Sequence, residues 1–121
     1  MIDFGPHFKS SEFDSPDQPG SGNNMQPDFI ERYKKAREIA GIPFHINSGF
    51  RTEVHNKKVG GESNSSHMGG WAADTRFNSG SEAWIILNAL IKAGFNRIGI
   101  YKTFIHADCD PSKPKNVIWT K

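Results

Sequence analysis

The sequence has little that would fix it by covalent bonds or hold it in a membrane. Its 121 residues include a single cysteine, Cys109, so no internal disulfide bond can form. No apolar run approaches the ~20 residues that cross a bilayer, and the longest such stretch, residues 83–93, is interrupted by Asn88 and Lys92. We therefore expect a fold that depends on its core, with a metal as a further source of stability, and no membrane partner.

Neither positive nor negative charge predominates in the sequence. The 15 Lys and Arg residues exceed the 13 Asp and Glu residues only slightly and are spread along the chain. Without a basic patch and interleaved aromatic residues, a nucleic-acid partner is not expected. The opening sequence MIDFGPHFKSSEF lacks the charged and apolar regions of a signal peptide, so we expect a protein that is cytoplasmic as made, and a monomer by default.

Hydrophobic periodicity predicts two main helices, at residues 27–40 and 81–93. Proline at position 27 suits the first turn of the first helix. In the second, Ser81 is the expected N-cap, and Trp84, Leu87 and Ile91 are expected to face the core.

Shorter elements are expected between and after these helices. The predicted strands are residues 44–50, 71–77, 97–101, 104–108 and 116–120, and a short helix is predicted at residues 52–59. This order predicts an α+β fold, a small, mostly antiparallel sheet with helices packed against it. We expect one domain over residues 1–121, with residues 1–26 irregular.

Three polar side chains stand out as metal ligands. His67 ends a serine-rich loop, and Asp74 lies on the following strand, on the face opposite its apolar residues. His106 and Asp108 share one face of a later strand. Two imidazoles and one carboxylate suit zinc and leave a position open for water, as in catalytic rather than structural sites.

The spacing Ser65-x-His67-x-x-Gly70-x-Ala72-x-Asp74 resembles the signature of the zinc D-Ala-D-Ala carboxypeptidase and endolysin peptidase family, peptidase M15. The segment SGFR at residues 48–51 and the segment FIHAD at residues 104–108 are similar to two other parts of that family. The resemblance extends over roughly residues 7–110 and implies a fold like that of the Hedgehog and D-Ala-D-Ala peptidases, with zinc in a cleft on the sheet.

The resemblance also implies roles for individual residues. His67, Asp74 and His106 match the ligands of one Zn²⁺ per chain, and Arg51, with Ser65, matches a substrate contact. Many members carry a carboxylate, the catalytic base, three residues before the last histidine, where this chain has Thr103. Asp108 is our candidate for that base; its alternatives are to orient His106 or to replace it as the third ligand.

Two functions are compatible with these residues. The first is a zinc metallopeptidase that cuts stem or cross-link peptides of bacterial peptidoglycan, as a D,D-carboxypeptidase or an endopeptidase. In lacking a signal peptide it is similar to small phage or prophage lysis proteins, endolysins among them, which reach the cell wall with outside help. The second is a non-catalytic zinc-containing module that binds the cell wall. Arg51 and the open metal position favour the enzyme, whereas Thr103 favours the module.

Overall fold

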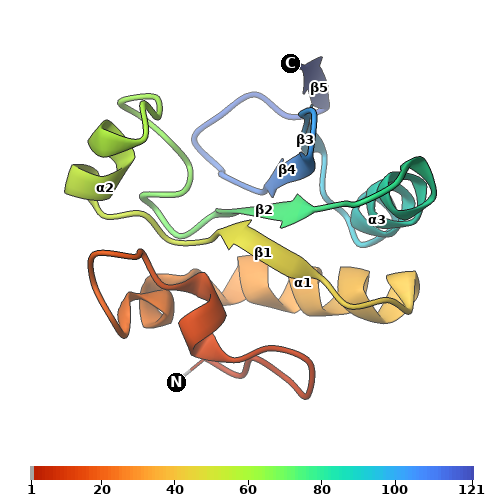
Figure 1. The fold of residues 1–121 in the computed structure, drawn as a ribbon, viewed down its shortest axis with the longest axis horizontal. Helices are drawn as coiled ribbons and strands as arrows, with labels where there is room; N and C mark the ends of the chain where they lie inside the picture. The colour runs from red at the N-terminus through yellow and green to blue at the C-terminus, as the bar shows by residue number, and fades with distance from the viewer. Residues whose placement is uncertain (1) are drawn as a thin grey trace.

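A five-stranded sheet forms the centre of the computed structural model, which describes residues 2–121 (Figure 1). Its strands are β1 (His45–Ser48), β2 (Ala72–Arg76), β3 (Arg97–Ile100), β4 (Phe104–Asp108) and β5 (Val117–Thr120). They lie in the order β1-β2-β4-β3-β5. All neighbours are antiparallel except β3 and β5, which are parallel. The predicted α+β class with a mostly antiparallel sheet is therefore confirmed.

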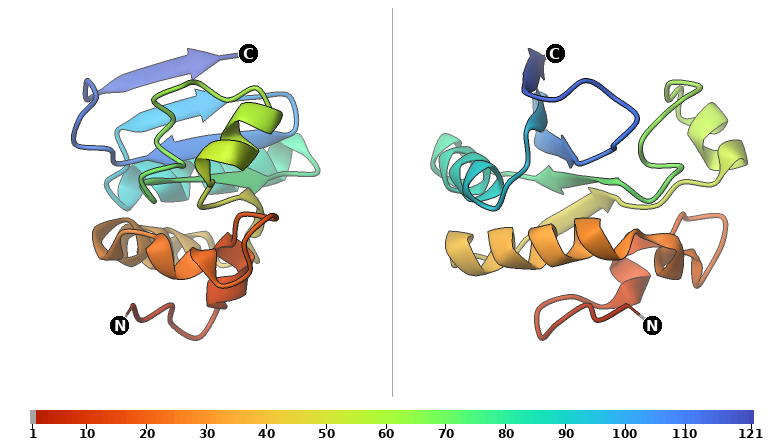
Figure 2. Two further views of the ribbon diagram at one scale, coloured as in Figure 1. Left: turned by 90° about the vertical axis from the view of Figure 1, so that its left-hand side faces the viewer. Right: turned by 180° about the vertical axis from the view of Figure 1, so that it is seen from behind.

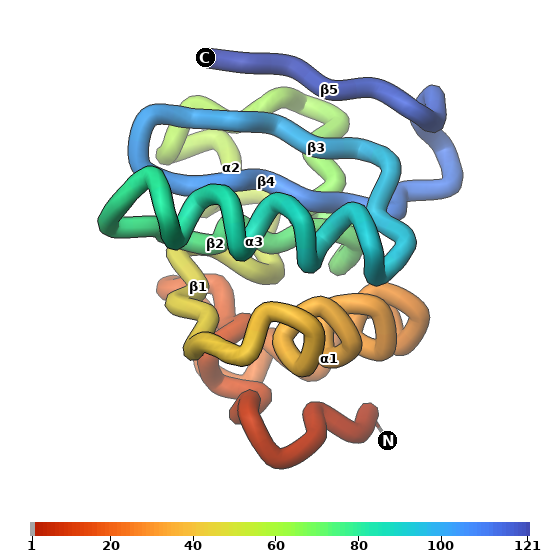
Figure 3. The backbone as a smooth tube through the Cα atoms, turned by 90° about the vertical axis from the view of Figure 1, so that its right-hand side faces the viewer, coloured from red at the N-terminus to blue at the C-terminus, as the bar shows by residue number. Residues whose placement is uncertain are grey.

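The two long helices cover one face of the sheet. Helices α1 (Pro27–Ala40) and α3 (Gly80–Lys92) pack against each other and lie on the same side of the strands (Figure 3). The short helix α2 (Glu53–Lys58) lies on the opposite side (Figure 2, left). The second face is thus left partly open beside α2. None of the helices in residues 2–121 is long and apolar enough to cross a membrane.

The N-terminal segment is tied to the core by aromatic side chains. It contains two 3₁₀ helices, Ser10–Phe13 and Ser21–Asn24, within the region expected to be irregular. Phe13 and Tyr33 are fully buried, with ring centroids 5.9 Å apart, and Phe8 stacks on Tyr33 at 5.1 Å. Such buried aromatic pairs stabilise the fold beyond the area they bury.

The predicted start and inner face of α3 were wrong. The cap is Ser79, whose Oγ accepts a hydrogen bond from the Glu82 amide at 3.1 Å, rather than Ser81. Trp84 is 70% exposed and Ile91 54% exposed, although Leu87 packs against the core. The buried residues of the helix are Ile86, Ala89 and Leu90. Because apolar residues surround most of this helix, their spacing alone could not select the inner face.

Strand alternation divides the sheet into an apolar face and a polar face, as predicted. Ser48, Asp74, His106, Gly99 and Trp119 form one row of paired residues across β1, β2, β4, β3 and β5. Residues one step along each strand point the other way, into the core under α1 and α3. The row thus gathers polar side chains from distant parts of the sequence on the open face.

The turn before β2 depends on a glycine. Gly70 has a φ of +78°, and a Cβ at this position would collide with the carbonyl oxygen of Asn24 and lie 2.9 Å from the Cα of Met25. Its own carbonyl accepts a hydrogen bond from the Gln26 amide at 3.0 Å. The turn that follows His67 is therefore packed against the start of α1, with no room for a side chain.

Replacing Gly70 by alanine should reduce the free energy of unfolding by about 2–4 kcal/mol, because both backbone strain and a collision result. Gly41→Ala is a matched control. Gly41 has a φ of +68° with no neighbour within 4 Å of an added Cβ, so strain alone should remove about 1–2 kcal/mol. Urea denaturation of both zinc-free proteins measures the difference, and equal losses would contradict the close packing of Gly70.

Candidate metal centre

Three side chains converge on the open face of the sheet. His67 lies in the loop before β2, Asp74 on β2 and His106 on β4. Asp74 Oδ1 lies 3.3 Å from His67 Nε2 and 3.0 Å from His106 Nδ1. One ligand atom from each residue lies within 4.8 Å of the others. The three residues predicted from the sequence therefore meet at one point and could hold a metal ion.

A backbone carbonyl fixes the imidazole of His67 through the ring nitrogen that does not face Asp74. Its Nδ1 lies 2.8 Å from the carbonyl oxygen of Gly49, and only 3% of the residue is exposed. A carbonyl can only accept, so Nδ1 carries a proton, and Nε2 is the ring nitrogen that faces Asp74. The backbone holds this loop too, because the Arg51 amide donates to the His67 carbonyl at 3.1 Å.

The imidazole of His106 is fixed in the same manner by a carboxylate. Its Nε2 lies 2.7 Å from Asp108 Oδ2, which leaves Nδ1 to face Asp74. The other oxygen of Asp108 accepts hydrogen bonds from Arg97 Nε at 2.7 Å and from the Asp110 amide at 3.2 Å. Asp108 thus lies behind His106 and is held by its own partners, on the far side of the ring from Asp74.

Arg51 lies beside the cluster. Its Nη2 is 3.5 Å from Asp74 Oδ2, and its Nε donates to Ser48 Oγ at 3.0 Å. Its Nη1 donates to Oδ1 of Asn56 at 3.3 Å, and Asn56 in turn donates to the Glu62 carbonyl at 2.8 Å. The sequence did not indicate Asn56, since a six-residue helix is too short for periodicity to show that this amide faces inward.

Burial and hydrogen bonds set the charges of the cluster. Burial raises the pKa of Asp74, but hydrogen bonds from His106 and His67 outweigh it and hold that pKa well below its usual range. Burial lowers the pKa of His67, whereas in His106 the hydrogen bonds to Asp108 and Asp74 overcome burial and raise the pKa. Asp74 therefore remains anionic, as a metal ligand must be.

The cluster lines a cavity of about 500 Å³. Ser65, predicted to contact substrate, lines the cavity, but its Oγ also accepts a hydrogen bond from the His67 amide at 3.2 Å. Thr103 lies in the exposed turn between β3 and β4. The residues that line the cavity beyond the predicted set include Glu62, Arg97, Tyr101, Lys113, Trp119 and Lys121.

This donor set fits zinc. Two imidazole nitrogens and one carboxylate oxygen are typical zinc ligands, and a set of three leaves a coordination position for water or substrate. Each imidazole also has a hydrogen-bond acceptor behind it, the arrangement that usually orients metal-bound histidines. The cluster could therefore hold a metal ion with an open coordination position, as in hydrolytic metalloenzymes.

A family model described as Peptidase M15 matches residues 6–109 of the chain. The chain therefore belongs to the peptidase M15 family, which confirms the resemblance seen in the sequence motifs. Members of this family are metallopeptidases that in general depend on zinc. A search of curated proteins finds no match to the chain.

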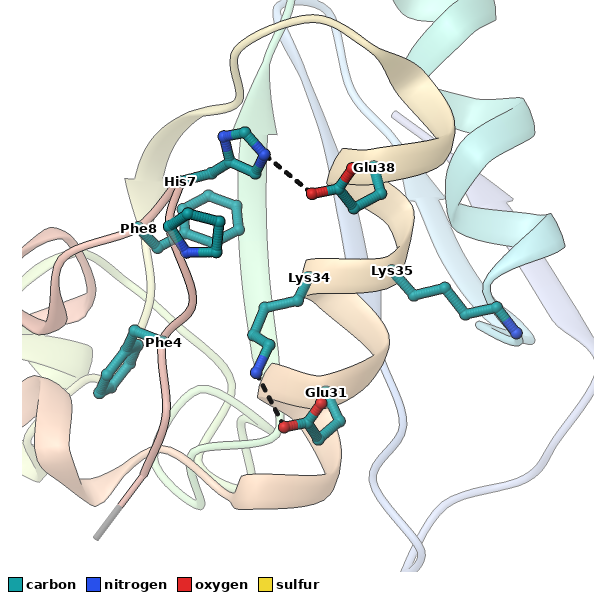
Figure 4. A pocket seen from close by; sticks show the side chains of 8 residues that line it. Phe4, His7, Phe8, Glu31, Lys34, Lys35 and Glu38 are labelled. Carbon is teal, nitrogen blue, oxygen red and sulfur yellow. Dashed lines mark hydrogen bonds and ion pairs between the residues drawn. The ribbon is translucent and has the colours of Figure 1, made fainter.

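A second, smaller cavity of about 240 Å³ lies between the N-terminal segment and α1 (Figure 4). Two ion pairs lie beside it. His7 Nε2 lies 2.9 Å from Glu38, and Lys34 Nζ lies 2.9 Å from Glu31 (Figure 4). The His7–Glu38 pair connects the N-terminal segment to α1, whereas the Lys34–Glu31 pair lies within α1. In residues 2–121, the side chains placed to hold a metal are those of His67, Asp74 and His106, not those of this cavity.

Cys109 follows Asp108 directly, yet its thiol should be unreactive. Burial raises the pKa of the thiol to about 11, and the carboxylate of Asp108 contributes to the increase. Because the thiolate is the reactive form, alkylation by iodoacetamide at pH 8 should be at least about tenfold slower than in urea. The rate should increase with pH until about pH 11, and mass spectrometry measures it. Equal rates in native and unfolded protein would contradict this assignment.

Proposed function

We propose that this protein is a zinc metallopeptidase that hydrolyses peptide bonds of bacterial peptidoglycan, with one zinc held by His67, Asp74 and His106. The observation that carries the proposal is the convergence of these three side chains, each oriented by a neighbour, in the lining of one cavity. Bound zinc would polarise the peptide carbonyl and make its water nucleophilic near neutral pH.

Arg51 has the position and charge to hold the substrate carbonyl. Its guanidinium lines the cavity and contacts Asp74, and hydrogen bonds to Ser48 and Asn56 fix its orientation. A fixed cation beside the reacting carbonyl stabilises the negative charge that develops on oxygen. Ser65, at the rim of the same cavity, is proposed to contact the peptide.

Asp108 is proposed to orient His106. Its two oxygens are engaged by His106 and Arg97, both at 2.7 Å, so neither is free to accept a proton from water. His106, with Nδ1 directed at Asp74, has the better geometry for the third ligand. Thr103 stands where many members of the family carry the catalytic base, and with Asp108 engaged in this way we assign no residue to that role.

The charges around the cavity support an acidic peptide as substrate. Arg51, Lys113 and Lys121 line it together with a single exposed carboxylate, Glu62. Peptidoglycan stem peptides bear free carboxylates, which complement these cations. The non-catalytic wall-binding module remains the second candidate, because Thr103 occupies the position where many members carry the base.

Digestion of purified peptidoglycan tests the function. Zinc-loaded protein should release peptides, and chelated protein or the His67→Ala variant should release none, because the metal site is lost. The exposed residue His45 supplies a control, since His45→Ala should retain both zinc and activity. Product masses would distinguish a carboxypeptidase from an endopeptidase. Protein that binds one zinc but releases no product would favour the non-catalytic module.

The role of Asp108 is tested with Asp108→Asn. If this residue orients His106, zinc affinity should fall ~10–100-fold, as is typical when a residue behind a ligand is changed. Competition with a chromophoric chelator measures the affinity, and Asp28→Asn on the exposed start of α1 is the control. Unchanged zinc affinity with lost activity would instead identify Asp108 as the base.

A further inference from the structure

The last strand, β5, places an aromatic side chain beside the metal ligands. It lies beyond residues 6–109, the region that matches the family model. Trp119 is paired with Gly99 on β3, and Gly99 with His106 on β4. A Cβ on Gly99 would collide with the indole, so this glycine allows the ring to lie across β3. The Trp119 and His106 ring centroids are 5.4 Å apart.

The indole in turn fixes a tyrosine. Trp119 Nε1 donates a hydrogen bond to the hydroxyl oxygen of Tyr101 at 3.1 Å. The Tyr101 ring also stacks on Phe104, with centroids 4.5 Å apart and planes 10° apart. An indole nitrogen can only donate, so the hydroxyl accepts from Trp119 and its own proton is available for another acceptor.

Residues 2–121 supply no such acceptor. Among the hydrogen bonds of residues 2–121, the Tyr101 hydroxyl takes part only in the one from Trp119. Tyr101, Trp119 and the three metal-binding side chains line the same cavity. Arg51 lines this cavity too.

We propose that Tyr101 donates a hydrogen bond to the substrate carbonyl oxygen as negative charge develops on it, and that Trp119 is the positioning residue that aims this hydroxyl. The inference rests on the proposed peptidase function and adds a catalytic donor to it. Tyr101 and Arg51 then approach the carbonyl oxygen as two preorganised donors, beside the zinc position. No proton is transferred, because the hydroxyl only shares its hydrogen with the oxyanion.

Kinetics on soluble peptidoglycan fragments test the proposal, with zinc content measured for each variant. Tyr101→Phe should lower kcat ~10–100-fold with KM within about threefold of wild type and zinc retained, as expected for a contact made in the transition state. Trp119→Phe keeps an aromatic ring but removes the N–H donor, so it should lower kcat by a smaller factor. It should cause no further loss in the Tyr101→Phe background.

Matched controls separate these effects from general loss of structure. Tyr33→Phe removes a buried hydroxyl that pairs with Thr75, and Trp84→Phe changes an exposed indole on α3; both should retain wild-type kcat. Gly99→Ala displaces the Trp119 ring without removing it and should reproduce the Trp119→Phe effect.

Three results would each overturn a different part of the proposal. Wild-type kcat in Tyr101→Phe would overturn the proposal and leave the peptidase function intact. If Trp119→Phe lowered kcat by the same factor with and without Tyr101→Phe, the positioning role of Trp119 would be overturned. Zinc-loaded wild-type protein without any product would overturn the peptidase function, and with it the role of Tyr101.

Discussion

Burial of one carboxylate is the constraint on which the arrangement of this site depends. Asp74, on the inner strand β2, is only 4% exposed, and an unpaired buried charge is strongly unfavourable. Its partners come from three separate segments, through Arg51, His67 and His106. Each partner is held by a further contact, so satisfying this carboxylate fixes the loop before β2, the segment after β1 and the strand β4 together.

The two faces of the sheet have different roles. One packs against the core, and the other carries the candidate metal ligands. Thr75, adjacent to Asp74, points the other way, where its hydroxyl lies 2.5 Å from that of the buried Tyr33. The core under the two helices therefore sets the position of β2 independently of any metal. On the polar face, Gly99 leaves the space that the Trp119 indole occupies.

Local patterns in the sequence predicted much of this arrangement, because alternation and turn chemistry act over a few residues. They predicted the faces of β2 and β4 and the candidate ligands His67, Asp74 and His106. They could not show which side of α3 is buried, since Trp84 and Ile86 both belong to apolar stripes. Nor could they show that Arg97 holds Asp108, because that contact depends on the register between β3 and β4.

The residues that line the cavity extend beyond the region that matches the family model. The family match ends at residue 109, but the cavity wall continues through Lys113, Trp119 and Lys121. Strand β5 carries part of this wall and is held in place by pairing with β3. The matched region contains the three candidate metal ligands, whereas the last strand lines another part of the same cavity. The cavity in which we propose that the peptide binds is therefore built in part by residues outside the region that identifies the family.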